Sequence, residues 1–165
     1  MMAQQLMPDI DEDRELDFDP SRLGLGMLLR DAYFALRRCS NAHCVPFDCN
    51  GDQFVLLKLL ADEDGVTQQD LVHRAGYDAS TTANMLKRLE NKGLVVRDEH
   101  PDDARAKVVC LTKEGRRLQR KLWRESEEMR RRLWECLPPE HRPIVADGLR
   151  RIAAEMEQLK NDFEG

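Results

Sequence analysis

Residues 78–112 constrain the fold most, because they join a short amphipathic helix to two β-rich runs. In the helical part, residues at spacings of three and four predict one buried face: Thr82, Met85, Leu86 and Leu89. The opposite face carries short hydrogen-bonding groups and cations: Ser80, Thr81, Asn84, Lys87, Arg88 and Asn91. Lys92 follows them as an expected phosphate contact. Gly93 is well placed to end the helix. The exposed residue types suit the base edges and phosphates of a nucleic acid duplex.

The two β-rich runs, residues 94–96 and 107–111, predict a hairpin. The segment between them, residues 100–106, is too polar to be core and predicts a long charged tip. We expect Asp103 to orient Arg105 into a minor groove, where the negative potential favours arginine, and Lys107 adds a cation to the same strand. An ordinary helix and hairpin with solvated charges is the alternative interpretation of this segment taken alone.

Three pieces of the sequence carry a resemblance to a known family: LENKGLVVR at 89–97, DARA at 103–106 and LTKEG at 111–115. In this order and spacing they resemble the pattern of the multiple antibiotic resistance regulator (MarR) family of winged helix-turn-helix repressors. The resemblance extends, weakly outside the middle, over residues 23–163. It implies a dimeric DNA-binding regulator with its recognition helix at residues 79–92 and its wing tip at 100–106.

The residues before the recognition helix predict three further helices. The first runs from residue 23 to about residue 43 and is ended by the Pro- and Gly-containing segment 44–51. The second, residues 52–63, has Asp52 as its expected cap. Its expected buried residues are Phe54, Val55, Leu56, Leu59 and Leu60. The third is capped by Thr67, with Asp70 in its first turn, and ends at Gly76, so that it forms a helix-turn-helix with the recognition helix.

The residues after the hairpin predict two long helices. Residues 113–137 form one charged helix that Pro138 and Pro139 stop. The last helix has apolar residues at alternating spacings of four and three, a coiled-coil period: Val145, Leu149, Ile152, Met156, Leu159 and Phe163. This stripe needs a partner helix, either from the same chain or from a second copy. The resemblance favours dimerisation, which would place two recognition helices about 34 Å apart on successive major grooves.

The expected fold class is therefore mainly α with a small β-hairpin wing (α+β), a winged helix-turn-helix with long N- and C-terminal dimerisation helices. Residues 1–20 are expected to be an acidic flexible arm, and residues 21–50 the N-terminal dimerisation helix and loop. The DNA-binding region is expected at 51–112, and the C-terminal dimerisation helices at 113–165.

The charge distribution reconciles a net charge of −5 with a DNA partner. Seven acidic residues and a single arginine lie within the first twenty residues, whereas residues 74–121 hold twelve Lys and Arg against seven Asp and Glu. Local charge sets the electrostatic footprint on DNA, so the overall acidity does not exclude binding.

The sequence shows neither a membrane span nor a signal peptide, and we expect a cytoplasmic protein with reduced thiols. Among its five cysteines, Cys39, Cys44 and Cys49 cluster near the end of the first helix. A buried inert cluster, a redox switch and a poorly spaced metal site with His43 are the three interpretations, of which we expect the first. We expect no metal and no cofactor.

The expected function is a sequence-specific transcriptional regulator, usually a repressor in the resembled family, that binds a palindromic operator as a homodimer. The resemblance also implies a small aromatic or phenolic effector, for which Phe34, Phe47, Phe54 and Trp123 are candidate lining residues. Two alternatives remain: a winged-helix protein-interaction module without DNA binding, and a cysteine-based redox-sensing repressor. The absence of a phosphate loop, a nucleophile elbow and an HExxH motif argues against an enzyme.

Overall fold

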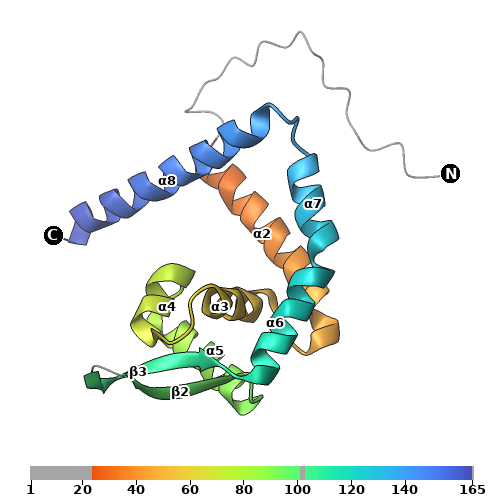
Figure 1. Ribbon diagram of the computed structural model, residues 1–165. Coiled ribbons are helices and arrows are strands. Elements are labelled where there is room, and N and C mark those ends of the chain that lie inside the picture. The colour runs from red at the N-terminus through yellow and green to blue at the C-terminus, as the bar shows by residue number, and fades with distance from the viewer. Residues whose placement is uncertain (1–23, 101–102, 165) are drawn as a thin grey trace, which may run out of the picture. The chain divides into compact units, whose positions relative to one another are not determined.

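The computed structural model describes residues 24–100 and 103–164, and the side chains of residues 99–106 and of 164 lie outside the description. The predicted acidic arm, residues 1–20, also lies outside the described residues. The chain is mostly helical with one small antiparallel sheet (Figure 1). Its elements, in order, are α2 (Leu25–Cys44), the 3-10 helix η1 (Val45–Phe47), α3 (Gly51–Asp62), β1 (Val66–Thr67), α4 (Gln68–Ala75), α5 (Ala79–Asn91), β2 (Val95–His100), β3 (Asp103–Leu111), α6 (Lys113–Glu125), α7 (Glu127–Glu135) and α8 (His141–Glu164).

The chain divides into two compact units, Met1–Cys39 and Ser40–Gly165, and the boundary falls inside α2. In the second unit α4, the turn at Gly76 and α5 form the predicted helix-turn-helix, and β2 and β3 form the wing beside it. The predicted fold class, a winged helix-turn-helix, is confirmed. No helix in the described part of the chain is both long and apolar enough to cross a lipid bilayer.

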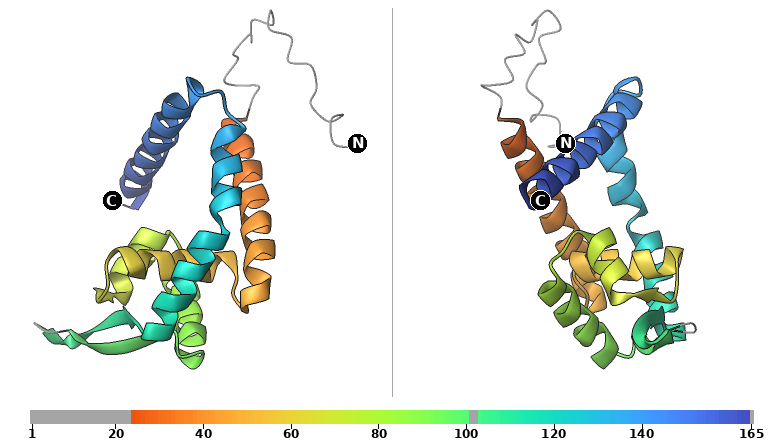
Figure 2. Two further views of the ribbon diagram at one scale, coloured as in Figure 1. Left: turned by 45° about the vertical axis from the view of Figure 1, so that its right-hand side comes forward. Right: turned by 90° about the vertical axis from the view of Figure 1, so that its left-hand side faces the viewer.

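The sheet has the strand order β1-β3-β2, and its strands are antiparallel. Strands β2 and β3 lie side by side in all three views, and α6 follows directly from the end of β3 (Figures 1 and 2). The predicted long charged tip at 100–106 is wrong, because β2 continues to His100 and β3 begins at Asp103. Backbone pairing in a ribbon needs no apolar side chains, so a polar sequence does not end a strand. Strand β1 has only two residues and was too short to be recognised from the sequence pattern.

The core of the second unit lies where α3, α4, α5, the sheet and α6 meet. The predicted buried face of α5 is confirmed in full. In α3 the prediction needs two corrections: Asn50, not Asp52, caps the helix in a capping box with Gln53, and Val55 is 41% exposed. Phe54 and Leu59 are only partly buried, whereas Leu57, which was not predicted, is fully buried.

The predicted single helix at 113–137 is wrong, because it breaks at Ser126 into α6 and α7. The fully buried Ser126 hydroxyl donates to the carbonyl oxygen of Trp123 at 2.9 Å. Arg130 donates from Nη2 to the same oxygen at 3.0 Å. These side chains satisfy backbone groups that an uninterrupted helix would bond internally, and local competition of this kind favours a helix end.

Candidate nucleic-acid interface

The start of α5 is fixed by Asp78. Its Oδ1 accepts from the backbone N–H of Thr81 at 2.7 Å, and its Oδ2 accepts from the Thr81 hydroxyl at 2.6 Å. These hydrogen bonds from Thr81 lower the pKa of Asp78 from its ordinary value. The carboxylate also lies at the positive end of the helix dipole. Thr81, a predicted DNA contact, is thus exposed but already donates its hydroxyl proton to the cap.

Four predicted contact residues share the exposed face of α5: Ser80, Asn84, Lys87 and Arg88. Within the described part of the chain, no hydrogen bond or ion pair engages the side chains of these residues. The opposite face of the same helix is buried, with Leu86 and Leu89 fully inaccessible. The helix is therefore held by its core face while it presents donors, an amide and two cations to a partner.

Lys92 differs from the other predicted contacts because it has partners inside the protein. Its ammonium lies 3.0 Å from Oδ2 of Asp48 and also donates to the Asp48 carbonyl oxygen. Asp48 caps η1 with a left-handed backbone, φ 51°. Sequence reasoning missed Asp48, because Asp48 and Lys92 are 44 residues apart along the chain.

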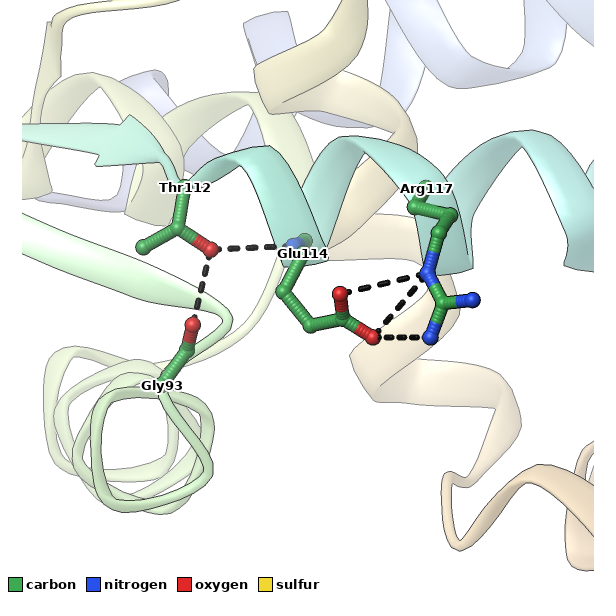
Figure 3. A network of polar contacts seen from close by, with 5 residues as sticks. Gly93, Thr112, Glu114 and Arg117 are labelled. Atoms are coloured by element: carbon green, nitrogen blue, oxygen red, sulfur yellow. Dashed lines mark hydrogen bonds and ion pairs between the residues drawn. The ribbon is translucent and has the colours of Figure 1, made fainter.

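Thr112 joins the end of the recognition helix to the wing and to α6 (Figure 3). Its hydroxyl donates to the Gly93 carbonyl oxygen at 2.7 Å and accepts from the backbone N–H of Gly115 at 2.9 Å. Its own N–H donates to the Leu94 carbonyl oxygen at 3.1 Å. Next to it, Glu114 pairs with Arg117, and this hydrogen bond lowers the pKa of Glu114.

The wing is attached to its surroundings at both of its strands. Arg97 of β2 lies 3.5 Å from Glu90 of α5. On β3, the N–H of Leu111 donates to Asp64 at 2.8 Å, and Arg116 pairs with the same carboxylate. Lys107 is exposed on β3. Asp103 and Arg105 belong to β3 by their backbone, but their side chains, and hence the predicted pairing, lie outside the described residues.

The predicted dimerisation residues of α8 are largely uncovered in the single chain. Phe163 is 81% exposed, Ile152 is only partly exposed, and the other four are exposed: Val145, Leu149, Met156 and Leu159. The structure thus places the expected apolar stripe on one long helix.

The candidate effector-lining residues are in different environments. Phe47 and Phe54 pack against the core, and Phe34 and Trp123 are exposed. The Trp123 ring contacts two cations, with Lys58 Nζ at 4.9 Å and Arg130 Cζ at 3.8 Å from its centroid. Sequence reasoning missed both cations: Lys58 is far from Trp123 along the chain, and Arg130, two helical turns after Trp123, was not considered.

The candidate cysteines separate into exposed and buried residues. Cys39 is exposed, whereas Cys44 and Cys49 are buried, and the Cys49 thiol donates to the Asn50 carbonyl oxygen at 3.4 Å. Over the described ranges, no group of three or more His, Cys, Asp and Glu side chains has the arrangement of a metal site.

Comparisons with known proteins place this geometry in a family. Residues 50–107 match the model of the MarR family. The chain is 35% identical over 98 residues to the transcriptional regulator HosA of Escherichia coli O111:H-, covering 56% of this chain and 73% of HosA.

Comparison with solved structures leads to the same family as comparison of sequences. The MepR–DNA complex of S. aureus superposes with a TM-score of 0.72 at 25% identity, covering 79% of this chain and 96% of MepR. NadR in complex with 4-hydroxyphenylacetate superposes with a TM-score of 0.68 at 28% identity, covering 78% of this chain and 92% of NadR. This chain therefore belongs to the MarR family and is a transcriptional regulator of that type, not an enzyme.

Proposed function

We propose that the protein is a cytoplasmic repressor that binds a palindromic operator as a homodimer and is released by a small aromatic or phenolic ligand. The observation that carries the DNA-binding part is the exposed face of α5, where Ser80, Asn84, Lys87 and Arg88 have no partner among the described residues. The amide of Asn84, in the middle of α5, and the guanidinium of Arg88, in its last turn, match the hydrogen-bonding edges of adenine and guanine in a major groove. The solved complex of MepR with DNA supports the same use of the fold.

Each part of the surface has its own role in this proposal. Ser80, Thr81, Asn84 and Arg88 contact bases or nearby phosphates, and Lys87 contacts a phosphate. Lys92 contacts a phosphate only if its ammonium gives up the ion pair with Asp48. Arg105, oriented by Asp103, enters the minor groove, and Lys107 contacts the backbone beside it.

The homodimer is supported by the exposed apolar residues of α8, because a monomer rarely leaves a stripe of this kind in water. The effector is supported by the solved complex of NadR with 4-hydroxyphenylacetate. Such a ligand releases DNA only if it binds the released conformation more tightly than the DNA-bound one.

The test is fluorescence anisotropy with the DNA upstream of the protein's own gene, measured at several salt concentrations. Asn84→Ala and Arg88→Ala should each cost roughly 1 to 3 kcal/mol in affinity for that DNA and reduce its preference over scrambled DNA. Lys87→Ala should weaken binding to both DNAs equally and reduce the salt slope by about one, because it removes a phosphate contact.

Arg124→Ala is the matched control, since it removes one exposed arginine from α6 rather than from α5. It should leave the affinity and the salt slope unchanged. Equal affinities of the wild type, the Asn84 variant and the Arg88 variant for operator and scrambled DNA would reject the proposal. That result would favour a protein-interaction module.

A further inference from the structure

Residues 80, 84, 88 and 92 lie one helical turn apart, so they form a single row along the exposed side of α5. The side chains of the first three, Ser80, Asn84 and Arg88, have no partner in the part of the chain that the structure describes. The fourth, Lys92, is the C-cap of the helix and is paired with Asp48. The row therefore ends in a cation whose charge is already balanced inside the protein.

Lys92 makes two contacts with Asp48 that differ in kind. Its ammonium donates to the Asp48 carbonyl oxygen, and it lies 3.0 Å from Oδ2 of the Asp48 carboxylate. The carbonyl oxygen is neutral, whereas the carboxylate oxygen binds the ammonium by the same charge-assisted hydrogen bonding as a phosphate oxygen. An ammonium has three N–H donors, so the carboxylate can be exchanged for a phosphate while the bond to the carbonyl oxygen stays.

The backbone of Asp48 is held in place, whereas its carboxylate is in water. Its N–H donates to the Val45 carbonyl oxygen at 3.1 Å, and the N–H of Cys49, the next residue, donates to the Cys44 carbonyl oxygen at 3.3 Å. The Asp48 side chain is 91% exposed, and Lys92 is its one partner among the described residues. An exposed ion pair of this kind is weak, so a competing anion can replace the carboxylate.

We propose that the Asp48 carboxylate competes with DNA phosphate for the Lys92 ammonium, and so limits how tightly the protein binds DNA of any sequence. The competition rests on the function proposed above, in which Lys92 is a phosphate contact. On binding, Lys92 exchanges the carboxylate for a phosphate oxygen. The phosphate then loses its condensed counterion, but the freed carboxylate attracts a cation, so the exchange adds almost nothing to the salt dependence of binding.

The experiment is fluorescence anisotropy of the full chain with the upstream DNA and with scrambled DNA. The salt series begins at about 0.1 M, where exposed charges more than about 10 Å apart are screened. The main variant is Asp48→Asn, which removes the charge and keeps a residue that tolerates the left-handed conformation.

Asp48→Asn should bind both DNAs about two- to fivefold more tightly, the range expected for the loss of an exposed ion pair. Its salt slope should steepen by about one, because the phosphate contact of Lys92 is then no longer offset. The preference for the upstream DNA should not change, since a phosphate contact carries no sequence information.

Variants of Lys92 separate this competition from a general effect of charge. Lys92→Ala alone should leave the salt slope nearly unchanged, because the exchange in the wild type releases almost no net ion. Asp48→Asn added to Lys92→Ala should neither tighten binding nor steepen the slope, since no ammonium is left for the phosphate. Asp62→Asn is the matched control, because it breaks another exposed lysine–aspartate pair, with Lys58 of α3. It should bind DNA like the wild type.

A structural role of the ion pair would give different results. If the carboxylate held the last turn of α5, Asp48→Asn would weaken DNA binding and speed hydrogen exchange at residues 88–93. Under the competition, exchange there should stay as in the wild type. The bond from Lys92 to the Asp48 carbonyl oxygen remains, and so does the bond from the Lys92 N–H to the Arg88 carbonyl oxygen at 3.2 Å.

The proposal is overturned if Asp48→Asn binds scrambled DNA no more tightly than the wild type, or if the gain persists without Lys92. A gain on scrambled DNA in a protein with no preference for the upstream DNA contradicts the function proposed above and supports the competition. A wild type that prefers the upstream DNA, with no gain from Asp48→Asn, contradicts only the competition. If neither protein binds either DNA, both proposals fail.

Discussion

Gly93 and Gly115 show that two glycines of one motif are needed for different reasons. Gly93 follows the recognition helix with φ 67°, and nothing within 4 Å would meet a Cβ there. Gly115 has an ordinary helical position in α6, but a Cβ would lie 1.9 Å from the Leu94 carbonyl oxygen. The first glycine is required by backbone conformation, and the second by the close approach of α6 to the start of the wing.

Gly115→Ala should therefore destabilise the protein by roughly 3 kcal/mol or more, because α6 and the wing must separate. Gly93→Ala should cost only about 1 kcal/mol, the usual penalty for a left-handed alanine. Urea unfolding followed by circular dichroism measures both. Equal costs for the two variants would show that α6 and Leu94 are not in the close contact described.

Thr82 is another residue whose substitution should change the free energy of unfolding in a definite direction. Its side chain is fully buried, and its hydroxyl has no hydrogen-bond partner among the described residues. Thr82→Val keeps the shape and removes the unpaired group, so it should raise the free energy of unfolding by about 1 kcal/mol. A loss of stability in the same urea titration would show that the hydroxyl has a partner in solution. Thr81→Val removes the hydroxyl's hydrogen bond to Asp78 and keeps the backbone bond of the cap, so it should lower the stability, and it serves as the comparison.

At the scale of elements, helix caps decide how stability depends on pH. Thr67 hydrogen bonds lower the pKa of Asp70 at the start of α4, and Thr81 hydrogen bonds lower that of Asp78 at the start of α5. A carboxyl whose pKa is lower in the folded state binds fewer protons there than in the unfolded chain. Its contribution is present above the unfolded pKa and is lost as pH falls through the folded pKa.

We therefore expect the free energy of unfolding to fall as pH drops below about 5, the upper edge of carboxyl titration in the unfolded chain. The double variant Asp70→Asn, Asp78→Asn keeps oxygen acceptors at both caps but cannot titrate there, so its profile should be flatter. Urea titrations at a series of pH values provide the profiles. Parallel profiles for the wild type and the double variant would contradict the claim that the Asp70 and Asp78 carboxyls cause the loss of stability at low pH.

The sequence predicted those elements whose signals are local. The buried face of α5, the Thr67 cap, and the ends at Gly76 and Gly93 follow from spacing and turn chemistry within a few residues. The break at Ser126 was missed because one serine in a charged helix is an ordinary surface residue until it is buried. The exposed face of α5 was predicted, but the Asp48–Lys92 link was not, because sequence separation hides contacts between distant segments.

At the scale of the whole molecule, the exposed apolar residues of α8 indicate a second copy as the partner. Leu149→Glu with Met156→Glu should convert a dimer into a monomer, because each charge would enter the apolar seam without a partner. Light scattering after size exclusion gives the mass directly. Gln158→Glu adds a charge to the same helix outside the seam and should leave the mass unchanged.

The double variant Leu149→Glu, Met156→Glu should also lose most of its operator affinity, since a single recognition helix reads only one half-site. A monomeric wild-type chain, or an unchanged mass for the double variant, would contradict the homodimer. The anisotropy assay then shows whether one chain is sufficient for binding.

The junction at Thr112 also bears on how the chain folds. Its bond to Gly93 closes a loop of only 19 residues, and its bond to Leu94 one of 18. Loops of this size lose little entropy on closure, and contacts close in sequence form quickly. The end of α5, the wing and the start of α6 are therefore expected to assemble early as one folding unit. Newly made chains would then join the end of α5 to the wing before α8 has left the ribosome.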